Sequence, residues 1–277
     1  MPNIDLHCHS TISDGVLSPG ELVARAAANG VDVLSLTDHD DCDGLPEARS
    51  AAASHGIRLL NGVEISVTWR GRTLHIVGLD IDPENADLRE GLESIRKGRT
   101  ERARKIADAL SKAGIPGSFE GAYAFASNKN LIGRTHFARF LVENGYAKDI
   151  QGVFRKYLVS GRPGHVSHQW AELDNAVDWI VKSGGIAVIA HPGRYDLSAA
   201  ALTALVEQFR ERGGLGLEVV TSSHTLDMAM RFCDLARRFD LFASQGSDFH
   251  SPQESRMDIG RLPPLPSGCR AIIEALH

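Results

Sequence analysis

Short apolar runs that end in histidine or carboxylate residues recur along this chain, and they restrict the folds that it can adopt. The first run is Ile4 to Asp14, IDLHCHSTISD, in which His7 and His9 lie two residues apart. Residues two apart project from the same side of a strand, so these imidazoles are expected to point together, away from Leu6 and Cys8. Such a pair is common on solvated strands, but similar endings on later apolar runs make a metal site the better interpretation.

The apolar runs alternate with segments of helical character. Seven strands are expected, at residues 3–9, 31–37, 57–67, 73–81, 186–191, 215–221 and 241–248. A short turn at Arg70-Gly71 joins the third and fourth strands, so this connection is expected to be a hairpin. Helices are expected in the longer connections, the first of them starting at Ser18-Pro19-Gly20-Glu21. The alternation predicts an α/β protein with a mostly parallel sheet, either closed as a barrel or open and doubly wound.

The positions of the candidate metal ligands distinguish these two architectures. We place candidates at the carboxyl ends of six of the seven expected strands: His7 and His9, His39, Glu64, His75, His191, and Asp248 with His250. In an open sheet, ligand sites gather at a single switch point, whereas a barrel brings the carboxyl end of every strand around one mouth. The sequence therefore predicts a closed barrel.

The segment 98–170 is too long for an ordinary connection, and its apolar residues recur at helical spacing. We expect a small helical insertion that caps the barrel mouth, so that residues 1–97 and 171–277 form the barrel. The basic residues of the insertion are Arg99, Arg102, Arg104, Lys105, Lys129, Arg134, Arg139, Arg155, Lys156 and Arg162. Most are expected on solvated helix faces. Arg134 and His136 differ, because they open a helix, where backbone N–H groups and basic side chains form a phosphate cradle.

Six histidines and three carboxylates make up the full set of candidate ligands: His7, His9, Asp14, His39, Glu64, His75, His191, Asp248 and His250. Nine ligands suit two or three divalent cations. The mixture of nitrogen and oxygen favours Mn, Fe or Zn over Mg or Ca, and we expect Mn. Asp38, Asp40, Asp41 and Asp43 are expected to orient ligands or shape the loop. Glu218 is expected on the water-exposed rim.

The overall composition argues against several other classes of protein. A formal net charge of −5 supplies no general basic field, so long duplex nucleic acid is not an expected partner. The four cysteines show no paired spacing, and we expect reduced thiols without a disulfide. A strand begins close to Met1, and no apolar run approaches the roughly 20 residues of a membrane span. We therefore expect a cytoplasmic protein without a signal peptide or a membrane anchor.

The assembled motifs resemble those of the PHP family, the polymerase and histidinol phosphatase metallophosphoesterases. These motifs are H-x-H at 7–9, Asp14, T-D-H-D at 37–40, G-x-E at 62–64, His75, H-P-G at 191–193 and S-D-F-H at 247–250. The resemblance implies a distorted (β/α)7 barrel with a trinuclear metal site that hydrolyses phosphoesters. It assigns His7, His9, Glu64 and Asp248 to one ion. It assigns Glu64, His75 and His191 to the second ion, and Asp14, His39 and His250 to the third.

The insertion resembles the branch of this family that removes the 3'-phosphate from nucleoside 3',5'-bisphosphates such as pAp. The resemblance implies that Asp14, His39, Glu64, Asp248 and His250 act in catalysis. Arg99, Arg134 and His136 are the expected substrate contacts. Three alternatives stay open: a 5'-to-3' exonuclease on short 5'-phosphorylated RNA, a histidinol phosphatase, and a metal-binding module without activity. The expected partner is thus a small nucleotide or a short oligonucleotide.

Overall fold

A sheet of seven main strands and one short strand organises the protein. The computed structural model describes residues 2–276, so Met1 and His277, the outer ends of the two expected barrel segments, lie outside the description. The main strands, in sheet order, are β1 (Ile4–Asp5), β2 (Val33–Leu36), β3 (Arg58–Trp69), β4 (Arg72–Leu79), β6 (Ile186–Ile189), β7 (Gly216–Thr221) and β8 (Phe242–Gly246). The short β5 (Ala171–Glu172) pairs with β3 in parallel.

The two edges of this sheet meet, which confirms the predicted barrel. The backbone N–H of Leu6 donates to the carbonyl of Gln245 at 3.0 Å, and that of Asp248 donates to His7 at 2.8 Å. A parallel bridge joins Cys8 to Phe249 in the same seam. Closure at this seam removes the exposed strand edges that an open sheet would carry.

Strand β4 runs against all the other main strands. It pairs antiparallel with β3 on one side and with β6 on the other. Arg70 and Gly71 both have positive φ, at 49° and 75°, as a tight two-residue hairpin requires. The predicted hairpin is confirmed, but the placement of His75 at a carboxyl end is wrong. His75 lies in the first half of β4 and reaches the mouth because this strand is reversed.

Alternate residues of the strands pack on the two sides of the sheet. On β3, Val63, Ile65 and Val67 face the outer helices. Leu60 instead packs inside with residues of β1, β2, β4 and β6, and the C-terminal Ile272 and Leu276 close this interior cluster. Glu64 has the same parity as Leu60, so the strand period directs its carboxylate into the barrel.

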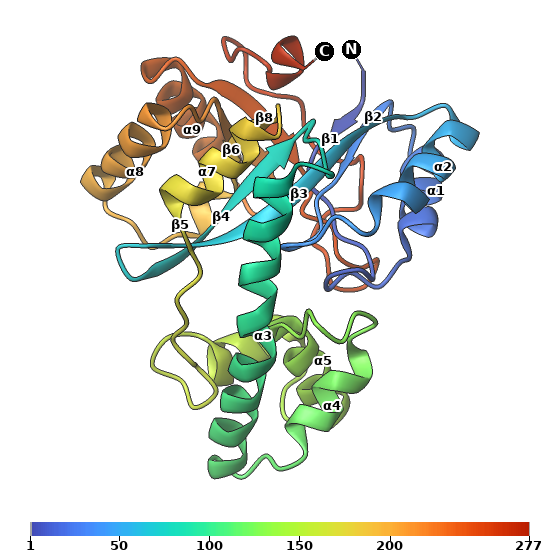
Figure 1. The fold of residues 1–277 in the computed structure, drawn as a ribbon, viewed down its shortest axis with the longest axis vertical. Helices are drawn as coiled ribbons and strands as arrows, with labels where there is room; N and C mark the ends of the chain where they lie inside the picture. The colour runs from blue at the N-terminus through green and yellow to red at the C-terminus, as the bar shows by residue number, and fades with distance from the viewer. Residues whose placement is uncertain (1, 277) are drawn as a thin grey trace.

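Helices cover the outside of the barrel in two groups (Figure 1). One group contains α1 (Pro19–Ala28) and α2 (Leu45–His55), and the other contains α7 (Leu173–Lys182), α8 (Ala199–Glu211) and α9 (Leu226–Arg238). The first helix begins where its sequence predicts, because Ser18 and Glu21 form a capping box. No helix within residues 2–276 is long and apolar enough to cross a membrane.

The insertion forms a separate helical lobe below the barrel in Figure 1. Its elements are α3 (Ala86–Lys112), α4 (Ser118–Phe125), α5 (Arg134–Glu143), α6 (Ile150–Val153) and a π-helical turn at Phe154–Leu158. The lobe has its own apolar cluster, in which Ile106, Leu110, Phe137 and Leu158 are buried. Helix α3 runs without a break from the barrel into this lobe, so residue 98 lies within a helix.

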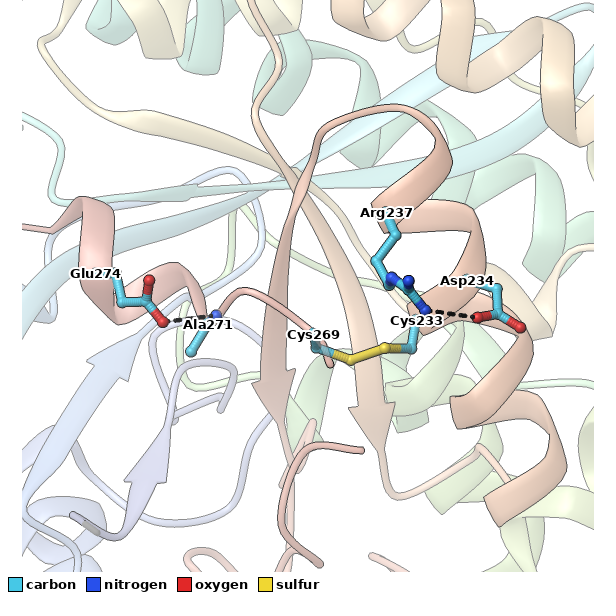
Figure 2. Close-up of a disulfide and its surroundings, with 6 residues drawn as sticks. All are labelled: Cys233, Asp234, Arg237, Cys269, Ala271 and Glu274. Atoms are coloured by element: carbon cyan, nitrogen blue, oxygen red, sulfur yellow. Dashed lines mark hydrogen bonds and ion pairs between the residues drawn. A yellow bond between two sulfur atoms is a disulfide. The ribbon is translucent and has the colours of Figure 1, made fainter. Parts of the chain in front are cut away.

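A disulfide joins Cys233 of α9 to Cys269 near the C-terminus (Figure 2), across 36 residues of sequence. The expectation that all four cysteines are reduced is therefore wrong for this pair. The two half-cystines share no local motif, and only the packing of α9 beside the C-terminal segment brings their Cα atoms to 5.6 Å. Cys8 and Cys42 are free thiols.

Candidate metal centre and substrate cavity

The barrel fold brings the predicted metal ligands together at one mouth. The structure groups eight of them into three overlapping clusters of donor atoms, within which all the atoms lie within 4.8 Å of one another. These clusters are His7, His9, Glu64 and Asp248; His39, Glu64 and His75; and His9, Asp14, His39 and His250. The remaining candidate, His191, places its Nε2 atom 3.0 Å from Glu64 Oε1.

Glu64 lies at the centre of this arrangement. Its Oε1 atom is 2.8 Å from His75 Nδ1, and its Oε2 atom is 2.9 Å from His39 Nδ1. Burial alone would raise the pKa of Glu64, but the surrounding imidazoles, chiefly His75 and His39, hold that pKa well below its usual value. The carboxylate is thus charged at neutral pH and can be shared between neighbouring cations.

The first cluster turns three donor atoms toward one point. His7 Nε2 and His9 Nε2 are 3.1 Å apart, and His9 Nε2 is also 3.1 Å from Asp248 Oδ1. Arg194 pairs with the other oxygen of Asp248. Burial would raise the pKa of Asp248, but Arg194 and His7 hold it well below its usual value. Two imidazole nitrogens facing each other and a carboxylate make a typical nitrogen and oxygen ligand set.

The third cluster involves a ligand from a loop. Asp14 Oδ1 is 3.2 Å from His250 Nε2 and 3.8 Å from His39 Nε2. Burial would raise the pKa of Asp14, but these two histidines hold it well below its usual value. Asp14 is therefore ionised, as a ligand must be.

Several buried metal-ligand atoms at this centre form no hydrogen bond within the described residues, although some lie at ion-pair distance from one another, as Glu64 Oε2 and His39 Nδ1 do at 2.9 Å. They are Asp14 Oδ1, His39 Nδ1, Glu64 Oε2, His75 Nδ1 and His191 Nδ1. A buried polar atom without a partner is costly. A group of buried nitrogen and carboxylate oxygen atoms without hydrogen bonds, with these residue types and spacing, fits the binding of divalent cations.

Glu218 on β7 supports these ligands, and its expected place on an exposed rim is wrong. It is 1% exposed, and its Oε1 atom is 2.7 Å from His7 Nδ1. Its Oε2 atom accepts the backbone N–H of His191. A carboxylate on Nδ1 fixes the tautomer that leaves the His7 Nε2 lone pair free for a cation. The alternation of apolar and polar residues along LGLEVV cannot identify this partner, because β7 is buried on both faces.

Asp38 and Asp40 orient their surroundings, as expected. Asp38 accepts hydrogen bonds from the hydroxyls of Ser10 and Ser13, both at 2.6 Å, and thereby holds the loop that carries Asp14. Asp40 accepts from the backbone N–H of Ser66 at 2.7 Å. The φ angle of Asp40 is 52°, in the sparsely populated left-handed region that often occurs at functional sites.

Arg194 and Tyr195, which follow His191 in the chain, complete the wall of the metal centre. The sequence reasoning missed both residues. Arg194 pairs with Asp248, and the hydroxyl of Tyr195 accepts the backbone N–H of His75 at 2.9 Å. Their only signal in the sequence is that they directly follow the H-P-G motif.

A cavity of about 770 Å³ lies between the metal centre and the insertion. Asp14, Glu64 and Asp248 lie on its barrel side, and Arg102 and Arg134 on its insertion side. Burial and the neighbouring Arg134 and Arg99 lower the pKa of Arg102 to about 9. Burial and Arg99 also lower the pKa of Arg134. No acidic side chain among the described residues offsets these lowered values, and the Nε atom of Arg102 is buried without a partner.

The three expected substrate contacts occupy different environments. Arg134 lines the cavity, as does Arg99, but Arg99 is buried and paired with Asp40. His136 is 1% exposed and is not among the residues lining the cavity. Its Nδ1 atom accepts the backbone N–H of Gly133 at 3.0 Å. Of the three, Arg134 and Arg99 therefore line the cavity and His136 does not, whereas Arg102, which the sequence did not single out, lines it as well.

A family model described as the PHP domain matches residues 5–222 of the chain. Over its whole length, the chain is 54% identical to a 3',5'-nucleoside bisphosphate phosphatase of Chromobacterium violaceum, and the match covers 97% of that protein. It is also 45% identical over 248 residues to a 5'-3' exoribonuclease of Haemophilus influenzae, which covers 90% of each chain.

A solved structure from Chromobacterium violaceum has the same fold. It is described as an amidohydrolase with bound sulfate and no metal, and it is 54% identical to this chain. The TM-score is 0.97, and the match covers 99% of this chain and 95% of that one.

Proposed function

The chain belongs to the PHP domain family, and we propose from this premise that it is a metal-dependent phosphatase of nucleoside 3',5'-bisphosphates. The reaction would remove the 3'-phosphate from a substrate such as pAp and leave the nucleoside 5'-monophosphate and phosphate. The 54% identical relative of that name supports this choice of substrate.

One observation carries the proposal: the cavity offers two places for a phosphate group. The clustered metal ligands line one side of it, and the uncompensated guanidinium groups of Arg102 and Arg134 line the other. A buried cation without a counter-ion is unfavourable, and a phosphate dianion would supply one through charge-assisted hydrogen bonds. A substrate with two phosphates can occupy both sides at once, whereas a monophosphate leaves one side unpaired.

The metal centre would hold two or three divalent cations, and Mn is the ion we propose. Its donors are nitrogen and carboxylate oxygen without thiolate, which suits Mn, Fe or Zn better than Mg or Ca. When bound, such cations neutralise phosphoryl oxygens and provide a nucleophile from water at neutral pH. The bound sulfate described for the Chromobacterium violaceum structure is a tetrahedral oxyanion of the same shape as phosphate.

The residues of the chain would then have distinct roles. Glu64, Asp248 and Asp14 keep the centre negative enough to hold cations, because their carboxyl groups stay ionised. Glu218 orients His7, and Asp38 orients the loop of Asp14. Arg102 and Arg134 would bind the nonreacting 5'-phosphate and so orient the 3'-phosphate toward the metal centre.

A 5'-to-3' exonuclease is the second candidate function. The 45% identical relative with that name favours it, and so does the position of Arg155 and Arg256 on the cavity lining. These side chains could contact the backbone of a nucleotide that extends beyond the first one.

A phosphate-release panel tests the proposal. The Mn-loaded protein is assayed with pAp, 3'-AMP, 5'-AMP, histidinol phosphate and short 5'-phosphorylated RNA. We expect the kcat/KM for pAp to exceed that for 3'-AMP roughly tenfold to a hundredfold, since one charge-assisted contact contributes about 1.5 to 3 kcal/mol. Equal kcat/KM values for pAp, 3'-AMP and histidinol phosphate would contradict the proposal. A preference for the RNA over pAp would favour the exonuclease.

A further inference from the structure

Arg139 belongs to the insertion, but its guanidinium group binds the barrel. It lies on α5 and is 8% exposed. Its Nε and Nη2 atoms donate to the two carboxylate oxygens of Glu254, at 2.9 and 2.7 Å. Nη2 also donates to the backbone carbonyl of Asp14 at 2.7 Å. A two-point pair of this kind fixes orientation as well as distance, so Arg139 locks α5 onto the barrel.

A second side chain of α5 reaches the same loop. His136, one turn before Arg139, is 1% exposed, and its imidazole lies beside the backbone of Ser13, which contributes to its pKa. Helix α5 therefore donates a hydrogen bond to Asp14 and places a buried imidazole beside the preceding residue of the same loop. On its opposite side, the loop is held by the barrel, because Ser10 and Ser13 donate to Asp38.

Glu254 connects Arg139 to a second loop, which carries His250. The hydroxyl of Ser255, the next residue, accepts the backbone N–H of His250 at 2.9 Å. The two loops also meet directly, since the N–H of Val16 donates to the carbonyl of His250 at 2.9 Å. Arg139 thus contacts both of the loops that place Asp14 and His250 3.2 Å apart in the third donor cluster.

The ligands of the other two clusters are held by different parts of the fold. Glu64 and His75 lie within the paired strands β3 and β4, and His7 is held by Glu218 on β7. Both of these clusters contain Glu64, which the β3–β4 ladder fixes, and they share His9 or His39 with the third cluster. None of the four residues of the third cluster lies in a strand of the sheet, and its Asp14 and His250 come from the loops that Arg139 contacts.

We propose that Arg139 is a positioning residue that couples docking of the insertion to the affinity of the third cluster for a divalent cation. The inference rests on the proposed metal-dependent function. Loss of the Arg139 contacts frees the loops of Asp14 and His250, so the third ion binds more weakly while the ions around Glu64 remain. Substrate and ion would thereby be linked, because the same insertion carries Arg134 on the cavity wall.

The test is a titration of metal-free protein with Mn²⁺ by calorimetry, with elemental analysis of the bound metal and circular dichroism of the fold. Arg139→Met removes the hydrogen bonds and keeps the aliphatic stem, and Glu254→Gln weakens the same pair from the barrel side. Arg104→Met, at an exposed position of the insertion, is the matched control. In both test variants we expect one Mn²⁺ to lose affinity roughly 10-fold to 100-fold, with the other two ions and the control variant unchanged.

The outcomes separate this inference from the proposed function. If Arg139→Met binds three ions with the same affinities as the wild type, the coupling is overturned and the proposed function is unaffected. If Arg139→Met does not fold, Glu254→Gln decides, and wild-type affinity for the third ion in that variant also overturns the coupling. If the wild type binds fewer than three ions, there is no third ion to couple and this inference is overturned. The proposed phosphatase function would then use two ions.

Discussion

The barrel mouth and the insertion face each other across one cavity, and their charged side chains differ in whether they have partners of opposite charge. At the mouth, each carboxylate has cationic or imidazole partners: Glu64 lies among histidines, and Asp248 lies beside Arg194. On the insertion side, burial and neighbouring arginines lower the pKa values of Arg102 and Arg134, and the two guanidinium groups lie over the rings of Trp170 and Phe154. The difference matches the proposed function, in which the mouth binds cations and the insertion binds a phosphate group.

The largest effect is expected from Glu64→Gln, which removes the charge at the centre of the mouth. Glu64 contacts donors in two of the three clusters, so its loss should weaken more than one cation. Losing several kcal/mol of electrostatic stabilisation corresponds to about 1,000-fold or more in kcat/KM. Elemental analysis after Mn loading and the pAp assay measure this effect. Retention of both metal content and activity would remove Glu64 from the metal centre.

Arg99→Met tests whether a paired arginine of the cavity behaves differently from an unpaired one. Its guanidinium group contacts Asp40 and lies 4.8 Å from the Trp170 ring. Breaking a buried ion pair leaves an uncompensated charge and costs about 3 to 5 kcal/mol. We therefore expect a clear loss of stability in urea unfolding, and Asp40→Asn should lose less when combined with Arg99→Met than alone. An unchanged free energy of unfolding together with a raised KM for pAp would instead indicate that Arg99 contacts the substrate.

Arg102→Ala and Arg134→Ala should raise the KM for pAp roughly threefold to tenfold each, because each removes one of the two guanidinium contacts that share the roughly tenfold to hundredfold contribution of the 5'-phosphate. The kinetics with 3'-AMP should change little, and Mn content should stay at the wild-type level. Neither variant should lose much stability, since relief of the repulsion among the arginines offsets the lost contacts with the Trp170 and Phe154 rings. An equal loss for pAp and 3'-AMP would place both residues outside the second phosphate site.

The smallest effect on either side of the cavity is expected from Cys269→Ser. The disulfide links residues 36 positions apart, so its removal should cost about 2 to 4 kcal/mol of stability. A reducing agent should lower the Tm of the wild type and leave that of the variant unchanged. The KM for pAp and the Mn content should be the same in both proteins. A changed KM would show that the C-terminal segment influences the cavity.

The amino-acid sequence by itself determined the barrel and the residues at its mouth. The strand period and the histidine or carboxylate near most strand ends are local features, and the need for those residues to meet leaves a closed barrel as the simple solution. The start of α1 and the β3–β4 hairpin followed in the same way from Ser18, Glu21 and the Arg70-Gly71 turn.

Only the tertiary structure decided which partner each charged side chain has. Glu218 turned out to orient His7, Arg99 to pair with Asp40, and Arg102 to stay without a counter-ion. Cys233 and Cys269 met across α9. The physical reason is that a local pattern specifies the direction of a side chain on its own element, whereas its partner depends on elements more than 30 residues away, whose relative positions arise from packing of the whole core.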